Sequence, residues 1–344
     1  MNTNCSLVMT SIAEPVNPVL RIFARECAAN AIPFIVIGDA ESPDGFNLDK
    51  CDFWSLDRQR GLPFELAGLL PEKTYARKNL GYLIAMRNNS EIIVETDDDI
   101  APKPEFWHAR SRTITARVIE NADWVNAYRC FTHHHIWPRG FALEKLRGLK
   151  DPYSLGNLRE VHAPIQQGLT DINPDVDAVY RLTLPLPVIF DRAQPVALGV
   201  NSWCPVDSQN TTWFREAFPL LYLPCNCSFR MTDIWRSLIA QRIAWSCGWH
   251  IVFHGATVCQ ERNEHNILKD FSDEVFGYLN NGRIADELQK LDLKAGIDAI
   301  GDNLLTCYAM MVGHGYIGRE EMKLVGAWIN DCRAISGCGA QAAS

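Results

Sequence analysis

Short apolar runs alternate with amphipathic segments through the first hundred residues. Residues 6–12 and 33–37 have the pattern of strands, and residues 91–95 form a third, shorter one. Residues 15–30 carry apolar side chains at helical spacing between the first two strands, and residues 79–86 suit a helix before the third. Strands and helices in this order imply βαβ units, so we predict an α/β fold with a mostly parallel central sheet flanked by helices.

The middle and the end of the chain differ from this first part. Residues 107–265 mix short strands, turns and helices, and residues 232–249 give the clearest helix there. From residue 268 onward the sequence is typical of helices, and it ends in a tail of small residues. We therefore predict two regions, an α/β part over residues 1–265 and a helical C-terminal region over residues 266–344.

The composition is that of an ordinary globular protein. Of the 344 residues, 47% are hydrophobic and 22% are charged, which argues against long disordered stretches. The formal net charge of −8 argues against a general nucleic-acid binder, because such proteins meet phosphates with a basic face. The first residues lack the basic and apolar regions of a signal peptide, and no apolar run is long enough to cross a bilayer.

The twelve cysteines are scattered along the chain and do not have the spacing of zinc or redox sites. The nearest pair, Cys225 and Cys227, is a C-x-C and not a C-x-x-C. In a chain of this length we expect free, mostly buried thiols and a reducing, cytoplasmic location.

Three consecutive carboxylates, Asp97, Asp98 and Asp99, follow the third apolar strand. In open α/β sheets, ligands bind just outside the carboxyl ends of the strands. Adjacent carboxylates repel one another unless a cation lies among them, and oxygen ligands suit Mg²⁺ or Mn²⁺ bound together with substrate phosphates. In an extended backbone Asp97 and Asp99 point to one side and Asp98 to the other. The triplet alone allows two interpretations, a metal site and a solvated acidic turn.

Two cations, Arg77 and Lys78, stand at the start of the helix that precedes this strand. Their charges oppose the helix dipole, so an anion such as a diphosphate near the helix start would account for them. A surface basic pair is the alternative interpretation. The glycine-rich phosphate loops of P-loop and dinucleotide-binding proteins are absent from the sequence.

Residues 75–100 contain K-N-L-G-Y-L-x-A followed by E-T-D-D-D. This segment resembles the STELLO family of GT-A-type glycosyltransferases, and the likeness continues in the family's order as far as about residue 260. The acidic triplet and the R-G-F and D-x-W blocks are also similar, more distantly, to reversibly glycosylated polypeptides and UDP-arabinopyranose mutases. The blocks that carry the resemblance are WPRGF at 137–141, QQGLTDINPDVDAVYR at 166–181, SQN at 208–210 and LYLPCNCSFRMTDIWR at 221–236.

The resemblance implies a GT-A-type nucleotide-diphospho-sugar transferase fold, with the acidic triplet between a nucleotide-binding half and an acceptor half. It implies that Asp97 contacts the ribose or sugar and that Asp99 binds the metal. Asp233 would be the acceptor-side base or an orienting carboxylate. Arg139 matches the self-glycosylated arginine of the distant relatives, and a contact to phosphate or carboxylate is its alternative role. The other donor-binding candidates are Asp39 near the base, Arg77 and Lys78 near the diphosphate, Asp98 within the triplet, and Ser208, Gln209 and Asn210 near the donor sugar.

One position departs from the family pattern. STELLO-like sequences read approximately T-V-H-R where this chain has Thr-Val-Cys-Gln, so Cys259 replaces a histidine that often serves GT-A enzymes as a third metal ligand. Thiolates are soft ligands and poor partners for Mg²⁺ or Mn²⁺. His254 and His265 are the nearby substitutes, and the predicted metal set is Asp97, Asp99 and His254.

The resemblance leads us to expect a metal-dependent glycosyltransferase with Mn²⁺ or Mg²⁺ as cofactor. Its expected partners are a nucleotide-diphosphate sugar, a UDP-sugar in the leading hypothesis, and a carbohydrate or other small-molecule acceptor. One alternative is a nucleotide-sugar mutase or self-glycosylating protein that acts through Arg139. A second is a non-catalytic scaffold that binds nucleotide-sugars, which Cys259 favours.

Overall fold

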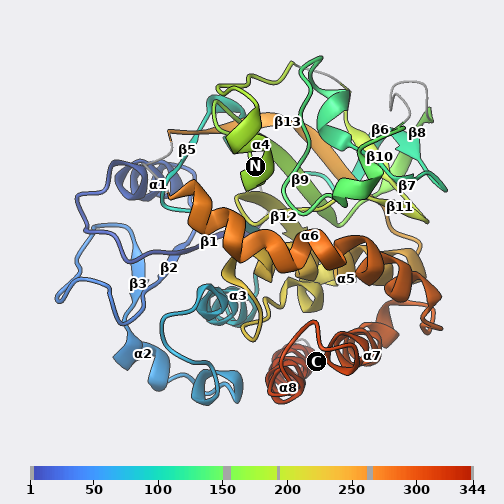
Figure 1. Cartoon of the computed structure of the whole chain (residues 1–344). Coiled ribbons are helices and arrows are strands. Elements are labelled where there is room, and N and C mark those ends of the chain that lie inside the picture. Colours follow the sequence, from blue (N-terminus) through green and yellow to red (C-terminus); the bar gives the residue numbers. More distant parts are fainter. Residues whose placement is uncertain (1–3, 150–155, 192–193, 262–265, 342–344) are drawn as a thin grey trace.

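The computed structural model describes residues 4–149, 156–191, 194–261 and 266–341, which form a mixed sheet covered by helices (Figure 1). The strands are β1 (Cys5–Thr10), β2 (Phe34–Ile37), β3 (Asp52–Trp54), β4 (Ile92–Thr96), β5 (Ile100–Pro102), β6 (Thr113–Ile119), β7 (Asp123–Trp124), β8 (Asn157–His162), β9 (Ile165–Asp171), β10 (Val196–Leu198), β11 (Ser202–Trp203), β12 (Asn210–Phe214) and β13 (Ile251–Gln260). The large sheet runs in the order β3-β2-β1-β4-β12-β9-β13-β10-β6-β8, with β5 paired to β13 beside this path. Strands β7 and β11 pair separately.

The strands predicted from the apolar runs are present, and they form the parallel part of the sheet. Strands β3, β2, β1 and β4 are all parallel to one another. Every residue of β4 is buried, as a strand covered on both faces requires. Beyond β4 the sheet is mixed, because β12 runs antiparallel to both β4 and β9 while β13 is parallel to β9. The predicted α/β class is confirmed.

The helices begin and end close to the predicted residues. Asn17 caps the first one, since its side-chain oxygen accepts hydrogen bonds from the backbone of Val19 at 2.8 Å and Leu20 at 3.1 Å, and a proline follows at the first helical position. The helices are α1 (Pro18–Ala29), α2 (Leu56–Arg60), α3 (Lys78–Arg87), α4 (Ala178–Thr183), α5 (Thr232–Ser246), α6 (Ile267–Lys290), α7 (Ile300–Gly313) and α8 (Glu321–Gln341). The predicted helical C-terminal region is therefore present.

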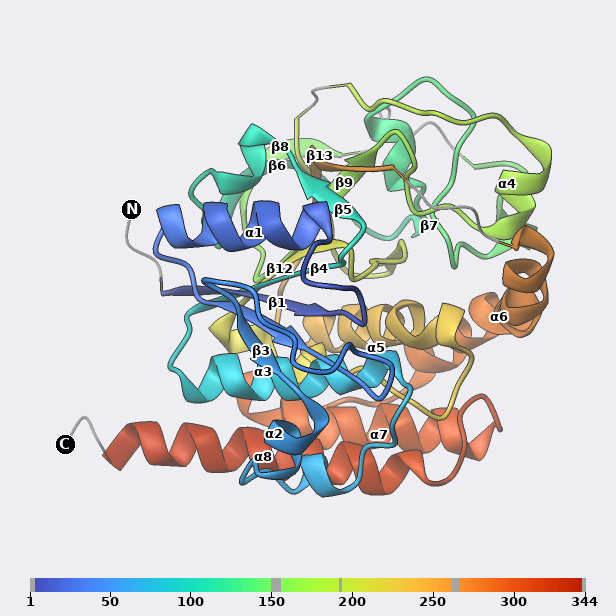
Figure 2. The ribbon, with the colours of Figure 1, turned by 90° about the vertical axis from the view of Figure 1, so that its left-hand side faces the viewer.

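Helices cover both faces of the parallel part of the sheet. Figure 2 shows α1 on one side of β1 and α3 on the other, with α7 and α8 below α3. Nearly all of α3 is buried, because it lies between the sheet and α8. Gly81 allows its close approach, since a Cβ there would come within 2.6 Å of Val8 and 3.0 Å of Ile37. The largest apolar cluster of the described residues joins α3 and α5 to α7 and α8, so it contains residues from both predicted regions.

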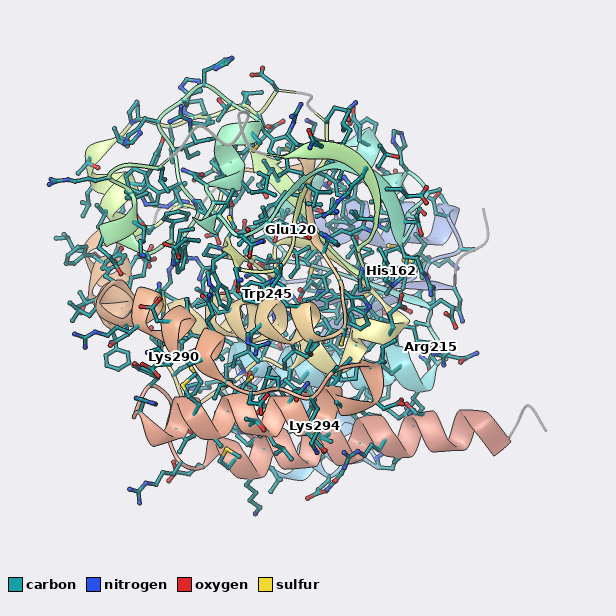
Figure 3. All side chains as sticks on the ribbon, turned by 90° about the vertical axis from the view of Figure 1, so that its right-hand side faces the viewer. Glu120, His162, Arg215, Trp245, Lys290 and Lys294 are labelled. Atoms are coloured by element: carbon teal, nitrogen blue, oxygen red, sulfur yellow. The ribbon has the colours of Figure 1, made fainter. Side chains whose placement is uncertain are left out.

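The C-terminal helices are tied to the rest of the fold by polar contacts as well. After α6 the chain turns at Lys294, labelled in Figure 3, whose Nζ pairs with Asp302 at 2.8 Å. The first residue of α8, Glu321, is fully buried and accepts a hydrogen bond from the backbone N–H of Asn226 at 2.8 Å. Among the described residues, no helix combines the length and the apolar character that crossing a membrane needs.

A buried ion pair connects the acid-bearing strand to helix α5. The guanidinium of Arg236 donates to both carboxylate oxygens of Glu95, at 2.9 and 2.8 Å. Trp213 of β12 donates to the same carboxylate at 2.8 Å, and the hydroxyl of Tyr82 in α3 donates to it as well. Four elements thus meet at one carboxylate two residues before the acidic triplet.

The described cysteines are all free thiols, as predicted, and six of the eleven are buried.

Candidate functional site

A cavity of about 390 Å³ opens at the carboxyl ends of β1, β2 and β4. This is the edge at which ligands bind in α/β sheets. Five predicted residues, Asp39, Asp97, Asp98, Asp99 and Gln209, line it. The other residues that line it are Thr10, Ser11, Ile12, Glu41, Lys73, Thr74, Tyr75, Asp175, Phe229, Arg230 and Gln260.

The acidic triplet lies in a turn, which corrects the expected alternation of its side chains. The backbone N–H of Ile100 bonds to the carbonyl of Asp97 at 3.2 Å, so the chain is not extended there. All three carboxylates therefore line the same cavity, and each has a different protein partner. The hydroxyl of Ser11 donates to Asp98, and the amide nitrogen of Gln260 donates to Asp99 at 2.6 Å.

Asp97 is held by two groups from the segment before α3. The hydroxyl of Tyr75 donates to its Oδ1 at 2.7 Å, and Lys78 Nζ lies 3.0 Å from the same oxygen. Lys78 is fully buried, and its Nζ also donates to the carbonyl of Thr96 at 2.9 Å. Lys78 therefore acts on the cavity through Asp97 and does not itself line it.

Burial raises the pKa of Asp97 to about 6. The positive charge of Lys78 opposes this shift, and the negative charge of Asp99 adds to it. Burial also raises the pKa of Asp98, while the hydrogen bond from Ser11 opposes the rise. A cation placed between the carboxylates would relieve both the desolvation and the repulsion of the ionised forms.

Arg77 and Asp39 hold the loop that forms one wall of the cavity. The guanidinium of Arg77 is buried away from the cavity and donates to Gln59 at 2.7 Å and to the carbonyl of Pro71 at 2.9 Å. The carboxylate of Asp39 accepts from the backbone of Lys73 at 2.8 Å and Thr74 at 3.0 Å. Asp39 lines the cavity at the end of β2, whereas Arg77 supports it from behind.

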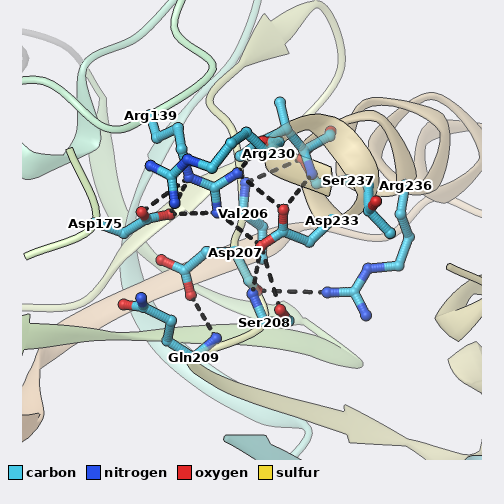
Figure 4. Close-up of polar contacts among 12 residues, drawn as sticks. Arg139, Asp175, Val206, Asp207, Ser208, Gln209, Arg230, Asp233, Arg236 and Ser237 are labelled. Carbon is cyan, nitrogen blue, oxygen red and sulfur yellow. Dashed lines mark hydrogen bonds and ion pairs between the residues drawn. The ribbon is translucent and has the colours of Figure 1, made fainter. Parts of the chain in front are cut away.

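The far wall of the cavity rests on Arg139, which is 4% exposed (Figure 4). Its Nε donates to Asp175 at 2.9 Å, and its two terminal nitrogens donate to Asp233 at 3.0 and 2.8 Å. It also donates to the carbonyl of Arg230. The contact to carboxylate that the sequence offered as the alternative role of Arg139 is therefore present, and two acids share one cation.

Asp233 lies at the start of α5 and holds the segment after β11. Burial alone would raise its pKa, but the charge and hydrogen bonds of Arg139 outweigh burial and lower the pKa to about 2. Its Oδ2 accepts from the backbone and the hydroxyl of Ser208, both at 3.2 Å. Asp207 beside it has a pKa raised well above the ordinary range by burial and by the charges of Asp175 and Asp233.

The three predicted donor-sugar residues face different surroundings. The hydroxyls of Ser208 and Tyr75 lie 2.6 Å apart, so Ser208 contacts the tyrosine that donates to Asp97. Gln209 lines the cavity, and its buried Oε1 has no hydrogen-bond partner among the described residues. Asn210 instead lines a second cavity of about 320 Å³.

The structure does not bring His254 to the acidic triplet. The pairing of β13 with β9 shifts between His254 and Val258, and His254 lies in the second cavity, where its Nε2 is 3.1 Å from Gln166 Oε1. Burial lowers the pKa of His254 to about 4. His265 lies outside the described residues. No group of three or more His, Cys, Asp or Glu side chains arranged to hold a metal is found within the described ranges.

Gln260 contacts the acidic triplet through Asp99. The family pattern instead has its metal-binding histidine at the neighbouring position, which is Cys259 in this chain. Successive side chains of a strand point to opposite faces, so only one of these two can face Asp99. Gln260 is 4% exposed and lines the cavity, and its Oε1 has no hydrogen-bond partner in the part of the chain that the structure describes. An unpartnered buried oxygen is costly and marks a place for a ligand.

Sequence reasoning missed Tyr75, Asp175, Gln260, Phe229 and Arg230. Four of them lie inside blocks that carried the family resemblance or directly beside them, so the blocks were a signal for these positions. Gln260 had no such signal, because it is a departure from the pattern and its partner is distant in the sequence.

Comparisons with known proteins confirm the predicted resemblance. A model of the STELLO glycosyltransferases matches residues 230–338. Two Arabidopsis thaliana proteins, named probable glycosyltransferase STELLO2 and STELLO1, are 29% identical over 318 residues and 27% identical over 320 residues. These alignments cover 86% and 88% of this chain but 41% of each relative, so the chain spans less than half the length of the curated relatives it matches.

Two solved structures are similar to this chain at a low level. One is glucosyl-3-phosphoglycerate synthase from Mycobacterium tuberculosis in complex with Mn²⁺, UDP-glucose and phosphoglyceric acid. It is 11% identical, with a TM-score of 0.41 over 82% of this chain and 80% of that one. Another crystal structure of the M. tuberculosis enzyme is 10% identical, with a TM-score of 0.39 over 82% and 81%.

We predict that ionisation of Asp97 lowers the stability of the metal-free protein as the pH rises, and that Asp97→Asn weakens this pH dependence. The folded-state pKa of Asp97 is about 6 and its ordinary value is 3.8, so the folded protein binds this proton more tightly than the unfolded chain does. Ionised Asp97 therefore lowers stability above pH 6, and this loss disappears as the pH falls toward 3.8. Between pH 4 and pH 7.5 we expect the unchanged protein to lose about 1 to 3 kcal/mol more stability than Asp97→Asn does. The cost of leaving the buried Lys78 without its anion is present at both pH values and cancels in this comparison.

Urea unfolding with a chelator present measures this difference at both pH values. Asp298, an exposed carboxylate outside the cavity, gives the control variant Asp298→Asn, which should change stability by less than about 0.5 kcal/mol. An equal change in stability between pH 4 and pH 7.5 for Asp97→Asn and for the unchanged protein would contradict the raised pKa of Asp97.

Proposed function

We propose that this chain transfers a sugar from a UDP-sugar to an acceptor hydroxyl with the help of Mn²⁺ or Mg²⁺. The observation that carries the proposal is the convergence of three carboxylates and two unpartnered amide oxygens in one cavity at the sheet edge. The carboxylates favour a cation, and the unpartnered amide oxygens favour hydrogen-bond donors. A divalent metal bound to a nucleotide-sugar supplies the cation, and the sugar hydroxyls supply the donors. The similarity to proteins named as probable glycosyltransferases supports the same reaction class.

The oxygen donors around the triplet fit a hard divalent cation. Asp97 and Asp99 offer carboxylate oxygens, and Gln260 offers a buried Oε1 that lacks a partner among the described residues. Mg²⁺ and Mn²⁺ prefer such oxygen ligands and commonly take one or two carboxylates together with substrate phosphates. We assign Gln260 the place that a histidine fills in the family pattern. When bound, the metal stabilises negative charge on the leaving diphosphate.

The chain's own groups divide between the two ends of the cavity. Thr10, Ile12 and Asp39 form the end where we place the nucleoside, and Gln209 and Asp175 line the end where we place the sugars. Transfer joins the acceptor oxygen to the anomeric carbon as the bond from that carbon to the diphosphate oxygen breaks, and the electron pair stays on the diphosphate. The acceptor's proton passes to a carboxylate, and we assign this role to Asp175. Asp175 and Asp233 both pair with Arg139, but only Asp175 lines the cavity.

We assign positioning roles to the buried charges behind the cavity. Lys78 fixes Asp97, and Asp233 fixes both Arg139 and Ser208. With a pKa of about 2, Asp233 is a weak base at neutral pH, which favours this role over proton transfer. Self-glycosylation through Arg139 is disfavoured, because its guanidinium would have to leave two carboxylates in a buried setting.

Calorimetry with UDP and Mn²⁺ or Mg²⁺ tests the proposal. We expect metal-dependent UDP binding, and we expect Asp99→Ala to weaken it by about a hundredfold or more because a metal ligand is lost. Asp298→Ala is the matched control, since it removes an exposed carboxylate that does not line the cavity. The absence of UDP binding with either metal would refute the proposal, and UDP binding without hydrolysis of any UDP-sugar would favour a non-catalytic binder.

A second prediction separates Gln260 from Cys259. Removing the amide in Gln260→Ala should weaken Mn²⁺ binding in the presence of UDP by about tenfold, because an oxygen ligand and a hydrogen bond to Asp99 disappear. Cys259→Ala on the opposite face of β13 should leave the affinity unchanged. Titration followed by the paramagnetic signal of free Mn²⁺ measures both. A larger loss in Cys259→Ala than in Gln260→Ala would overturn the assignment of Gln260.

A further inference from the structure

Phe229 is an exposed aromatic side chain at the mouth of the cavity. It is 63% exposed and yet lines the cavity together with Tyr75 and Gln209. Its ring meets that of Tyr75 edge to face, with centroids 5.7 Å apart and planes at 83°. The hydroxyl of Tyr75 donates to Asp97, so Tyr75 contacts both the exposed ring of Phe229 and the acidic triplet.

The segment that carries Phe229 is fixed on both sides by buried carboxylates of the C-terminal helices. Glu321 of α8 accepts from the backbone of Asn226 at 2.8 Å and from its side chain at the same distance. Glu274 of α6, which is fully buried, accepts from Arg230 Nε at 2.7 Å. Phe229 therefore presents a flat apolar ring at a fixed place in the cavity lining, where a ligand can pack on it.

Two hydrogen-bond acceptors, Gln209 and Asp175, line the cavity together with Phe229. Gln209 Oε1 has no partner among the described residues, and Asp175 presents a carboxylate to the same end of the cavity. Acceptor oxygens call for donors, and sugar hydroxyls supply them.

The charges of the cavity wall disfavour an anionic acceptor. Two cations line the cavity, and both are paired: Arg230 lies 2.7 Å from Glu274, and Lys73 lies 3.9 Å from Glu41. The bound UDP would take up the charge of the metal. An anion arriving at the Phe229 end would therefore enter a cavity lined by more carboxylates than cations. The carboxylates that line the cavity are Asp39, Glu41, Asp97, Asp98, Asp99 and Asp175.

We propose that the acceptor is a neutral carbohydrate whose pyranose ring stacks on Phe229 while its hydroxyls donate to Gln209 and Asp175. The apolar face of a pyranose packs on an aromatic ring, and its edge carries hydroxyl donors. Gln209 Oε1 has no partner among the described residues, and the carboxylate of Asp175 can accept a further bond beside those from Arg139. The high exposure of Phe229 suits the acceptor, which must enter and leave beside a bound donor. This inference rests on the proposed function, because it places the acceptor next to the UDP-sugar.

Ligand-observed NMR titration of the protein saturated with UDP and Mg²⁺ tests the inference. The probes are the methyl glycosides of glucose, galactose, mannose and xylose, compared with glucose 6-phosphate and glucuronic acid. We expect a neutral glycoside to bind more tightly than either anion. Phe229→Ala should weaken that binding by about tenfold more than it weakens UDP binding, while Phe229→Trp should retain it.

Phe271→Ala is the matched control, because Phe271 is a partly exposed phenylalanine of α6 that does not line the cavity, and it should bind like the unchanged protein. The inference is overturned if no neutral glycoside binds, if the anions bind more tightly, or if Phe229→Ala binds sugar as well as the unchanged protein does. UDP binding, measured first in the same samples, separates this failure from a failure of the proposed function.

Discussion

The buried ion pair between Glu95 and Arg236 is the contact on which the candidate site depends. It fixes β4 to α5, and Trp213 and Tyr82 add β12 and α3 to the same carboxylate. Removing one member of such a pair leaves an unpaired buried charge, which typically costs about 3 to 5 kcal/mol. The acidic triplet begins two residues after this anchor, so its position relative to α5 is set before any ligand arrives.

The site gathers more carboxylates than the surrounding cations neutralise. Lys78 and Arg139 are buried behind the cavity and hold Asp97, Asp175 and Asp233 in fixed positions. Burial raises the pKa of Asp97 to about 6, which means that the ionised triplet is destabilised without a cation. Ionising these carboxylates costs free energy because they are buried and because they repel one another. A bound metal relieves both costs, so they favour metal binding. The C-terminal helices contribute by fixing the segment that presents Phe229 and Arg230.

Periodicity and the family blocks were enough to predict the parallel strands, α5 and the place of the acidic triplet. They were not enough for contacts made across the sheet, because these depend on register. His254 was expected near Asp99, but the antiparallel pairing of β13 with β5 sets Gln260 opposite Ile100 and therefore beside Asp99. The alternation expected for Asp97, Asp98 and Asp99 was wrong because the backbone turns at the triplet. The burial of Lys78 could not be predicted. Nearly all of α3 is buried, and the sequence of the helix alone does not show which other elements cover it.

We propose that the turn after β4 and the end of β13 together form one metal–nucleotide site. Anomalous diffraction from crystals grown with Mn²⁺ and UDP tests this most directly, since it locates the metal without assuming its ligands. The account predicts one strong Mn²⁺ peak within coordination distance, about 2.0 to 2.4 Å, of oxygens of Asp99 and Gln260. A peak at His254 or Cys259, with UDP bound away from the triplet, would contradict it.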